Sequence, residues 1–391
     1  EGTEMVEPGC WVSFSRSGRI TRDTYYEFPK ECSPSLGPAE ADEAIVDVLD
    51  RAVRRHLVCD VPVGCFLSGG VDSPLIASVF RRVDARPIIP AFTIGSTDAG
   101  IDESESAHRH ATSIGLQLHS KQMTDREAEC LLDDVMAAST EPQADEGMFP
   151  SLMVSQLAAE RVKVALSGEG ADELFWGYVQ RQCPFLSSPE AKDGRVSWKD
   201  YSPWFTEFRP EEFEACFPDI SWFPTGHPLF DPDSLDSHHP AYSVRRYEMR
   251  TYLPFILLKT DRASMYHSLE VRLPFLDREV IEVASRVRWE SCLDLNATVG
   301  KCSLRRILQN RGIRPSLHKR GFTAPMDGWL RGRLKQRIVE CLDGLDEVGG
   351  VRFDQKAIEK LWSLHQQGVV QRGIAFWRIF VLCEWLRRNL T

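Results

Sequence analysis

The sequence predicts an α/β fold with a doubly wound parallel sheet, followed by a helical C-terminal part. Strand-like apolar runs alternate with helical patterns up to residue 166, and helical patterns dominate from residue 241 onward. Small, glycine-rich turns follow two of the strands, at residues 68 and 167. Strands that alternate with helices form parallel sheets covered on both faces. Because ligands of such sheets bind beyond the carboxyl ends of the strands, we expect both turns at one site.

The first 36 residues are turn-rich and weakly patterned. Two short alternating stretches, 10–14 and 24–28, predict a hairpin that leads into the main fold. Apolar residues then recur at helical spacing from residue 41 to residue 58, which predicts the first helix of an α/β core over residues 37–180. The remaining core elements expected from the pattern are strands over 63–67, 87–94, 117–123 and 163–166 and helices that end at residue 82 or span 102–114, 125–138 and 149–161.

The second half of the chain changes character. Residues 184–240 are rich in proline and aromatic residues and show little periodicity, which predicts a long excursion from the core. Helical patterns fill the last part, residues 241–391. The pattern at 374–389 is apolar nearly all round, so this helix is expected to be buried. The other helices expected here are 243–266, 277–287, 301–311, 327–343 and 354–367.

Composition narrows the class of protein. The chain has 391 residues, 42% of them hydrophobic and 27% charged, values typical of a globular protein with two domains or one large core and an appendage. A net charge of −10 disfavours nonspecific binding to nucleic acid or to an anionic membrane. Eleven cysteines without C-x-x-C pairs indicate reduced thiols, and no apolar run approaches a membrane span. A cytoplasmic protein is therefore expected, with no nucleic-acid or membrane partner.

The first turn, Ser68 to Ser73, reads S-G-G-V-D-S between a strand and a helix. Such a turn presents backbone N–H groups and a helix N-terminus to an anion. Gly69 and Gly70 can take positive φ and let a phosphate approach the backbone. Asp72 would repel the phosphate unless Mg²⁺ lies between them. An ordinary turn is the alternative, but the complete hexapeptide in this setting favours phosphate binding.

The second turn, residues 167–178, reads S-G-E-G-A-D-E-L-F-W-G-Y. Its carboxylates Glu169, Asp172 and Glu173 would repel one another at an edge already expected to hold phosphate. A divalent metal, a basic partner or an amine substrate would offset this repulsion. The alternative is a solvated acidic turn that caps the next helix. Its pairing with the first turn favours a binding site.

Together the two turns resemble the synthetase half of the glutamine-dependent asparagine synthetases, which belong to the N-type ATP pyrophosphatases. The resemblance covers nearly the whole chain from about residue 40. It implies an adenine-nucleotide α-hydrolase-like fold and cleavage of ATP between its α and β phosphates. The further motifs that carry it, in the order of the family, are D-V-P-V-G-C-F-L before the first turn, residues 253–265, S-L-E-V-R-L-P-F-L-D at 268–277, G-K-C-S-L-R at 300–305 and K-R-G-F-T-A-P at 319–325.

The resemblance also implies roles for single residues toward ATP and Mg²⁺. Asp72 and Asp172 would hold the metal. Lys301 and Lys319 would neutralise the triphosphate, and Lys319 would stabilise the phosphorus centre as pyrophosphate leaves. For Lys301 considered alone, a solvated helix residue is the simpler interpretation. The adenosine pocket would be lined by Leu67, Ile94, Ser167 and Gly168, and the pyrophosphate would be bound by Ser68, Gly69, Gly70, Val71, Asp72 and Ser73.

On the acceptor side, Glu169 would take a proton from attacking ammonia, and Asp261 would orient the acceptor. Asp172, Glu173 and Tyr178 would complete the acceptor site. A carboxylate is a poor electrophile, so attack on the α-phosphorus would first give an acyl-adenylate, which ammonia then converts to an amide. By contrast, the residues Glu270, Arg272 and Asp277 of the 268–277 motif are interpreted as a structural ion-pair network.

The chain departs from the family at two places. Pro74 stands where members usually carry Ser or Thr, so one hydroxyl contact is lost. Complete members begin with a glutaminase domain, and residues 1–36 are interpreted as the tail and linker of such a domain. The expected partners are a small carboxylate, ammonia and a glutaminase domain or subunit that supplies it, with a homodimer left open.

Three rival functions stay open. An ATP-dependent cyclase of the β-lactam synthetase or lasso-peptide type would use an internal amine, but the β-lactam branch has G-Y-G-A-D where this chain has G-E-G-A-D-E at 168–173. A noncatalytic scaffold is disfavoured by the joint presence of Asp72, Glu169, Asp172 and Lys319. A tRNA-modifying pyrophosphatase is disfavoured by the acidic balance of the chain. The identity of the carboxylate, with aspartate as the family default, is not fixed by the sequence.

Overall fold

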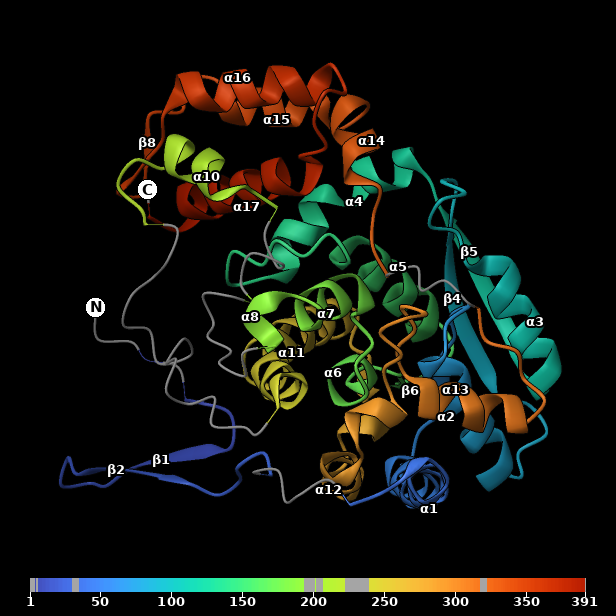
Figure 1. Ribbon diagram of the computed structural model, residues 1–391. Coiled ribbons are helices and arrows are strands. Elements are labelled where there is room, and N and C mark those ends of the chain that lie inside the picture. The colour runs from blue at the N-terminus through green and yellow to red at the C-terminus, as the bar shows by residue number, and fades with distance from the viewer. Residues whose placement is uncertain are drawn as a thin grey trace.

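A computed structural model describes the chain in five main stretches, which Figure 1 shows in colour. The residues that the structure describes are 4, 6–29, 35–192, 201, 207–221, 239–316 and 322–390.

The centre of the fold is a five-stranded sheet in which every strand pair is parallel. Its order is β5-β4-β3-β6-β7, so β3 lies between β4 and β6. The chain therefore winds outward in one direction from β3 to β5 and in the other direction from β6 to β7. A crevice forms where the direction reverses, beyond the carboxyl ends of β3 and β6. The strands are β3 (Val63–Phe66), β4 (Pro90–Ser96), β5 (Gln117–Met123), β6 (Val164–Leu166) and β7 (Glu270–Arg272).

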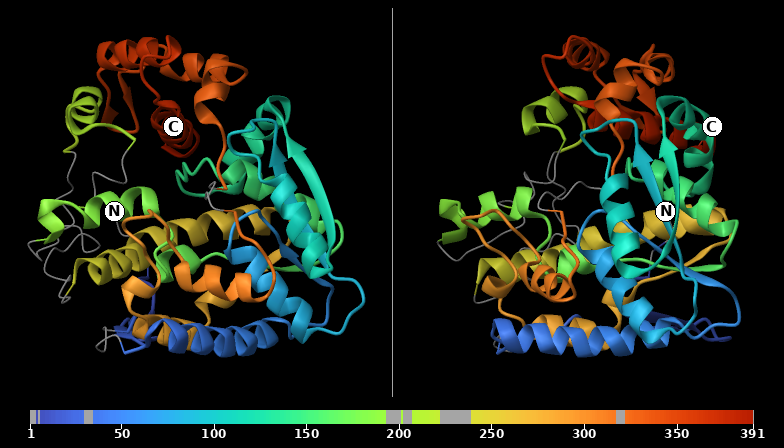
Figure 2. Two further views of the ribbon diagram at one scale, coloured as in Figure 1. Left: turned by 45° about the vertical axis from the view of Figure 1, so that its right-hand side comes forward. Right: turned by 90° about the vertical axis from the view of Figure 1, so that its right-hand side faces the viewer.

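Helices cover both faces of this sheet (Figures 1 and 2). Successive strand residues point to opposite faces, and they accordingly join two separate apolar clusters: Ala91 packs in one cluster and Phe92 in the other. The doubly wound α/β class predicted from the sequence is thus confirmed. One cluster includes α1 (Pro38–His56), α2 (Asp72–Val83), α3 (Ser104–Ile114), α12 (Arg278–Arg286) and α13 (Cys302–Asn310), and the other includes α4 (Asp125–Ala138) and α5 (Met148–Ala159). The long helix α11 (Pro240–Tyr266) contributes to both.

Helix α1 shows how the local sequence sets an element and how the tertiary fold completes it. Pro38 occupies the first turn, and Glu40 accepts a hydrogen bond from the Gly37 N–H at 3.1 Å. At the other end, Arg272 donates to the carbonyls of His56 at 2.7 Å and Val58 at 2.9 Å. A strand residue therefore stabilises the C-terminus of a helix more than two hundred positions earlier in the chain.

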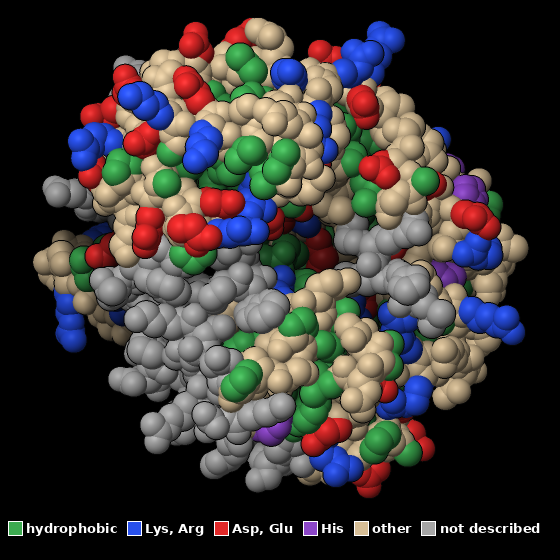
Figure 3. All heavy atoms as spheres, turned by 45° about the horizontal axis from the view of Figure 1, so that its top comes forward, with side chains coloured by type: hydrophobic (Ala, Val, Ile, Leu, Met, Phe, Trp, Pro, Cys, Tyr) green, Lys and Arg blue, Asp and Glu red, His purple; other side chains and the backbone are tan. Residues whose placement is uncertain are grey.

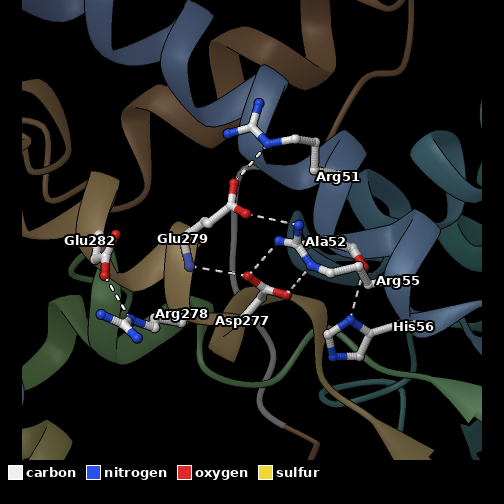
Figure 4. Close-up of polar contacts among 8 residues, drawn as sticks. All are labelled: Arg51, Ala52, Arg55, His56, Asp277, Arg278, Glu279 and Glu282. Carbon is white, nitrogen blue, oxygen red and sulfur yellow. Dashed lines mark hydrogen bonds and ion pairs between the residues drawn. The ribbon is translucent and has the colours of Figure 1, made fainter. Parts of the chain in front are cut away.

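A network of ion pairs fixes α1 against α12 (Figure 4). Asp277 begins α12 by accepting a hydrogen bond from the Glu279 N–H at 3.0 Å, and its carboxylate also accepts from Arg55 at 2.8 and 3.0 Å. Arg55 and Arg51 then share Glu279. The expected network of Glu270, Arg272 and Asp277 is only partly correct: Arg272 pairs with Glu270 at 2.7 Å, whereas Asp277 pairs with Arg55.

The C-terminal helices form a layer of their own on the α4–α5 side, at the top of Figure 1. The burial expected for the last helix is confirmed, since Phe376, Trp377 and Phe380 are all at most 1% exposed. The single helix expected over 327–343 is wrong, because the chain leaves helical geometry at Gly332. The elements are α14 (Met326–Arg331), α15 (Lys335–Leu342), the short strands β8 (Glu347–Val348) and β9 (Val351–Arg352), α16 (Gln355–Gln366) and α17 (Gly373–Leu390).

At the opposite end, the expected hairpin is present as β1 (Cys10–Phe14) and β2 (Ile20–Thr24), so its second strand lies earlier than the predicted 24–28. It extends away from the sheet in Figure 1. Within the excursion 184–240, the described parts contain helices rather than only irregular chain, and α10 packs through Phe213 and Phe217 toward Phe353 of the C-terminal layer. The remaining elements are α6 (Ala171–Leu174), α7 (Val179–Leu186), α8 (Pro189–Lys192), α10 (Pro210–Cys216) and the 3₁₀ helices Pro274–Leu276 and Trp289–Ser291.

None of the helices in the described ranges is long and apolar enough to cross a lipid bilayer.

Candidate active site

A cavity of about 430 Å³ lies at the switch point of the sheet, beyond β3 and β6. In Figure 3 the surface is hollowed near the centre of the view, and acidic, basic and apolar side chains show there. The cavity receives side chains from both predicted turns, from α11 and from the start of α13. The predicted site residues that line it are Leu67, Ser68, Gly70, Val71, Asp72, Ser73, Ser167, Gly168, Glu169, Asp172, Tyr178 and Lys301.

The turn after β3 is held by its own hydroxyls. Ser73 Oγ accepts a hydrogen bond from the Ser68 N–H at 2.8 Å, and Ser68 Oγ accepts from the Gly70 N–H at 3.2 Å. The Gly69 N–H donates to Glu103 Oε2 at 3.1 Å, so this N–H already binds an anionic oxygen. Helix α2 starts directly afterwards, and its first-turn N–H groups face the same edge.

Neither Gly69 nor Gly70 adopts the positive φ that glycine permits. At Gly69 the requirement is space: a Cβ there would lie 2.7 Å from Ser106 Cβ. Gly168 of the second turn has the same role, since its Cβ would meet the backbone of Ser73 at 2.7 Å. Glycine thus allows the two turns to pack directly on each other.

Lys301 connects the two turns. Its Nζ lies 2.5 Å from Asp72 Oδ2 and 2.8 Å from Asp172 Oδ1, and the lysine is only 4% exposed. Burial alone would lower the pKa of Lys301, but the two carboxylates outweigh it and raise the pKa. Lys301 also has φ +54°, a left-handed conformation that is uncommon for a residue with a side chain and clusters at functional sites. It is a buried cation at the head of α13, not a solvated helix residue.

Asp72 and Asp172 are the two carboxylates that were expected to bind a metal ion. In the described ranges no group of three or more His, Cys, Asp or Glu side chains is arranged to hold a metal ion. However, Asp72 and Asp172 both reach one cation, Lys301 Nζ. Mg²⁺ commonly binds through one or two carboxylates together with substrate phosphates. The donor set therefore fits Mg²⁺ that arrives with a nucleotide.

Glu169 is a buried carboxylate at the wall of the cavity. Thr260 Oγ1 donates to its Oε1 at 2.6 Å, while Oε2 accepts no hydrogen bond from any described residue. Burial raises the pKa of Glu169, and the nearby Lys259 opposes the rise. A carboxylate with one oriented oxygen and one available oxygen is suited to accept a proton.

Glu173 lies behind the cavity wall and does not line it. It is 1% exposed, and Tyr178 donates a hydrogen bond to its Oε1 at 2.6 Å. Burial, together with the charge of Asp172, raises the pKa of Glu173 to about 7. Tyr178 itself lines the cavity, so Glu173 acts on the site by orienting that ring.

Besides Glu173, three predicted site residues do not line the cavity, and another lies outside the described residues. Ile94 is packed in the apolar cluster of α4, α5 and α11. Gly69 lies behind the first turn, against Glu103 and Ser106. Asp261 is exposed, with 62% of its side chain accessible, because successive helical residues differ by about 100° in direction. Lys319 is the residue that falls outside the described residues.

Sequence reasoning missed several residues that line the cavity. Lys259 and Thr260 lie on the inward side of α11, immediately before the Asp261 that was chosen instead. The Arg181 guanidinium lies over the ring of Tyr178, at 3.8 Å from its centroid, and over that of Tyr252, at 4.4 Å. The helical spacing of Tyr252, Phe255, Ile256 and Lys259, at i, i+3, i+4 and i+7, was the signal for a shared face. Asp145 and Glu146 lie in a connection with no pattern of their own.

Curated proteins match this chain over nearly all of its length. A Mycobacterium tuberculosis protein provisionally named asparagine synthetase (glutamine-hydrolyzing) is 30% identical over 98% of this chain and 64% of its own length. Asparagine synthetase (glutamine-hydrolyzing) 1 of Bacillus subtilis is 30% identical over 99% of this chain and 65% of its own length. Amidase chry2 of Gibberella zeae is 23% identical over 99% of this chain and 68% of its own length.

The chain therefore spans about two thirds of the length of the curated relatives it matches. Residues 44–387 match the family described as Asparagine synthase, which agrees with the resemblance found in the motifs and covers both sheet faces and the C-terminal layer. The chain belongs to the asparagine synthase family.

Proposed function

We propose that the chain is an ATP-dependent carbon–nitrogen ligase that activates a carboxylate as an acyl-adenylate and converts it to an amide with ammonia. The observation that carries this proposal is the meeting of the glycine-serine turn and the acidic turn at the switch point, with Lys301 joined to both. The names of the two bacterial relatives, asparagine synthetase (glutamine-hydrolyzing), support it. Aspartate is the default acceptor on this basis.

ATP would enter along the edge of β3 and β6. Leu67, Ser167 and Gly168 would contact the adenosine, and the turn from Ser68 to Ser73 would bind the β and γ phosphates through backbone N–H groups and hydroxyls. Asp72 and Asp172 would hold Mg²⁺, which when bound offsets the charge of the triphosphate. Lys301 would give the same site a fixed positive charge, and Lys319 would assist departure of the pyrophosphate.

The acceptor would lie on the α11 side of the cavity. One of its carboxylate oxygens attacks the α-phosphorus, the bond from that phosphorus to the pyrophosphate breaks, and pyrophosphate leaves. Ammonia then forms a bond to the acyl carbon, and AMP leaves with the oxygen that had attacked. Glu169 would take the proton released from ammonia, since its Oε2 is available while Thr260 orients Oε1.

The test is product analysis with purified protein, ATP, Mg²⁺, ammonium and a panel of carboxylic acids. AMP, pyrophosphate and an amide, each formed only when an acid is present, are the expected products by mass spectrometry. ADP with orthophosphate as the main products would refute adenylation. Dehydration of a single substrate without uptake of ¹⁵N from labelled ammonium would instead identify an internal-amine cyclase.

A further inference from the structure

Lys259 differs from the other cations among the described residues that line the cavity. Its residue is 5% exposed and lies on the inward face of α11. Within the described part of the chain, its Nζ makes no hydrogen bond and has no carboxylate oxygen within 4.0 Å. A buried ammonium group without a bonded partner is costly, and it is retained where an anion binds.

The other lining cations are already bonded. Lys301 pairs with Asp72 and Asp172, and the Arg181 side chain donates to Glu248 at 3.0 Å. The remaining two are Arg305, which donates to the carbonyls of Gly300 at 3.0 Å and Ser316 at 2.7 Å, and Arg378, which lies 4.0 Å from Glu207.

The lining of the cavity makes such a cation necessary for an anionic acceptor. Among the described lining residues, carboxylates outnumber cations, so a second carboxylate that enters with ATP is repelled unless one positive charge is available to it. Burial alone would lower the pKa of Lys259, but Asp145 and Glu169 outweigh it and raise the pKa, so Lys259 stays charged. These two carboxylates favour the charged form of Lys259 without contacting its Nζ atom, which therefore stays available to a ligand.

We propose that Lys259 binds the carboxylate of the acceptor and later stabilises its oxygen. This inference rests on the proposed function and assigns its acceptor site. The adjacent Thr260 orients Glu169, so one turn of α11 places the cation and the base side by side. After one carboxylate oxygen has bonded to the α-phosphorus, the other oxygen stays next to Lys259. It gains negative charge when ammonia adds to the carbon, and the ammonium group offsets that charge until AMP leaves.

The neighbouring side chains also limit what the acceptor carries. Tyr252, Phe255 and Ile256 line the cavity from the same helix as Lys259. The carbon chain next to the bound carboxylate therefore meets aromatic and aliphatic surface. An acceptor with its reacting carboxylate at the end of a short carbon chain fits this arrangement.

The test compares Lys259→Met, Lys259→Arg and Tyr266→Phe. The last is a control, because Tyr266 lies on the same helix α11 but is exposed and outside the cavity. ATP–pyrophosphate exchange is measured against the concentration of L-aspartate, L-glutamate, succinate, β-alanine and acetate. For the acids that support exchange, Lys259→Met should raise the acceptor KM by about tenfold to a hundredfold, the effect of losing a hydrogen bond to a charged group. The KM for ATP should change by less than about threefold.

Lys259→Arg should recover part of the acceptor affinity because it keeps the charge, and Tyr266→Phe should match the wild type. An unchanged acceptor KM in Lys259→Met would overturn the proposal and leave Lys259 only an electrostatic neighbour of Glu169. Circular dichroism checks the fold of each variant. If Lys259→Met does not fold, Lys259→Gln takes its place.

A second measurement separates this inference from the proposed function. If no acid supports exchange in the wild type, adenylation fails, but carboxylate binding is still read from thermal stabilisation by the same five acids. Stabilisation of the wild type that Lys259→Met lacks would support the site. Equal stabilisation of both proteins, or none of the wild type, would overturn it.

Discussion

The Nζ atom of Lys301 lies 2.5 Å from the Oδ2 atom of Asp72, although 229 positions separate the two residues in the sequence. This ion pair ties the beginning of α13 to the beginning of α2. Asp172, at 2.8 Å from the same Nζ, adds the turn after β6. One buried lysine thus holds together the three segments from which the nucleotide side of the cavity is built.

Replacement of this lysine should destabilise the fold as well as the site. In Lys301→Met, Asp72 and Asp172 keep their largely buried positions, at 18% and 17% exposure of their side chains, but lose their shared cation. We expect a loss of about 3–5 kcal/mol in the free energy of unfolding at pH 7, measured by urea denaturation. The double variant Lys301→Met with Asp172→Asn should recover part of it. A loss below about 0.5 kcal/mol in the single variant would show that water or other groups satisfy the carboxylates.

Glu169→Gln should separate the two half-reactions of the proposed ligase. Glutamine keeps the shape and the hydrogen bond from Thr260 but cannot take a proton. Acceptor-dependent ATP–pyrophosphate exchange should survive, while amide formation falls by roughly a hundredfold or more. Lys319→Ala should reduce both steps. Amide formation at the wild-type rate in Glu169→Gln would assign the proton to another group or to water.

Glu173 should make stability depend on pH near neutrality. Its pKa is raised to about 7 by burial and by Asp172, so the folded protein holds a proton that the unfolded chain releases near its ordinary pKa of 4.5. Wild-type stability should therefore fall as pH rises from about 4.5 to 7 and then level off. Glu173→Gln should lack this fall and gain about 1–3 kcal/mol relative to the wild type between pH 5 and pH 8. Parallel stability curves for the two proteins would contradict the assignment.

Asp277 should show the opposite dependence. Burial alone would raise its pKa, but the Arg55 guanidinium outweighs burial and lowers it. Its contribution is present above the ordinary pKa of the carboxyl group and is lost as pH falls through the lower folded value. Asp277→Ala should cost about 1–2 kcal/mol at pH 7, because it removes both the helix cap and the ion pair. Asp277→Asn, which keeps a capping oxygen, should cost less, and both differences should shrink below about pH 3. A pH-independent difference would mean that the ion pair contributes nothing.

Much of the sheet and its covering helices could be predicted from the sequence, because local sequence patterns mark these elements. The strand 117–123 and the helix 125–138 have the predicted limits, since regular alternation and a Thr124–Glu127 capping box mark them. Strand β7 was not predicted, because three residues with charged ends carry no pattern of their own. It becomes a strand by pairing with β6, and this depends on chain more than a hundred residues away.

The site was predicted best where motif and turn coincide. Both turns meet at the crevice as expected, because the strands before them are neighbours in the sheet. The exposed position of Asp261 has a different origin: a motif marks a segment of helix, but the phase of α11 against the sheet decides which of its residues face inward. Lys259 faces inward only because of this phase, which is set by tertiary packing.

The span between Asp72 and Lys301 also has a consequence for synthesis of the chain. At about 5–20 residues per second, a ribosome takes roughly 10–50 s to add the 229 positions between the two residues. Asp172 is added within this interval, so in its later part both carboxylates are present but the lysine that joins them is not. The proposed nucleotide pocket therefore matures late. Until Lys301 is added, a nascent chain that already contains both turns has carboxylates that repel one another at an open edge of the sheet. A chaperone or a bound cation would have to shield that edge.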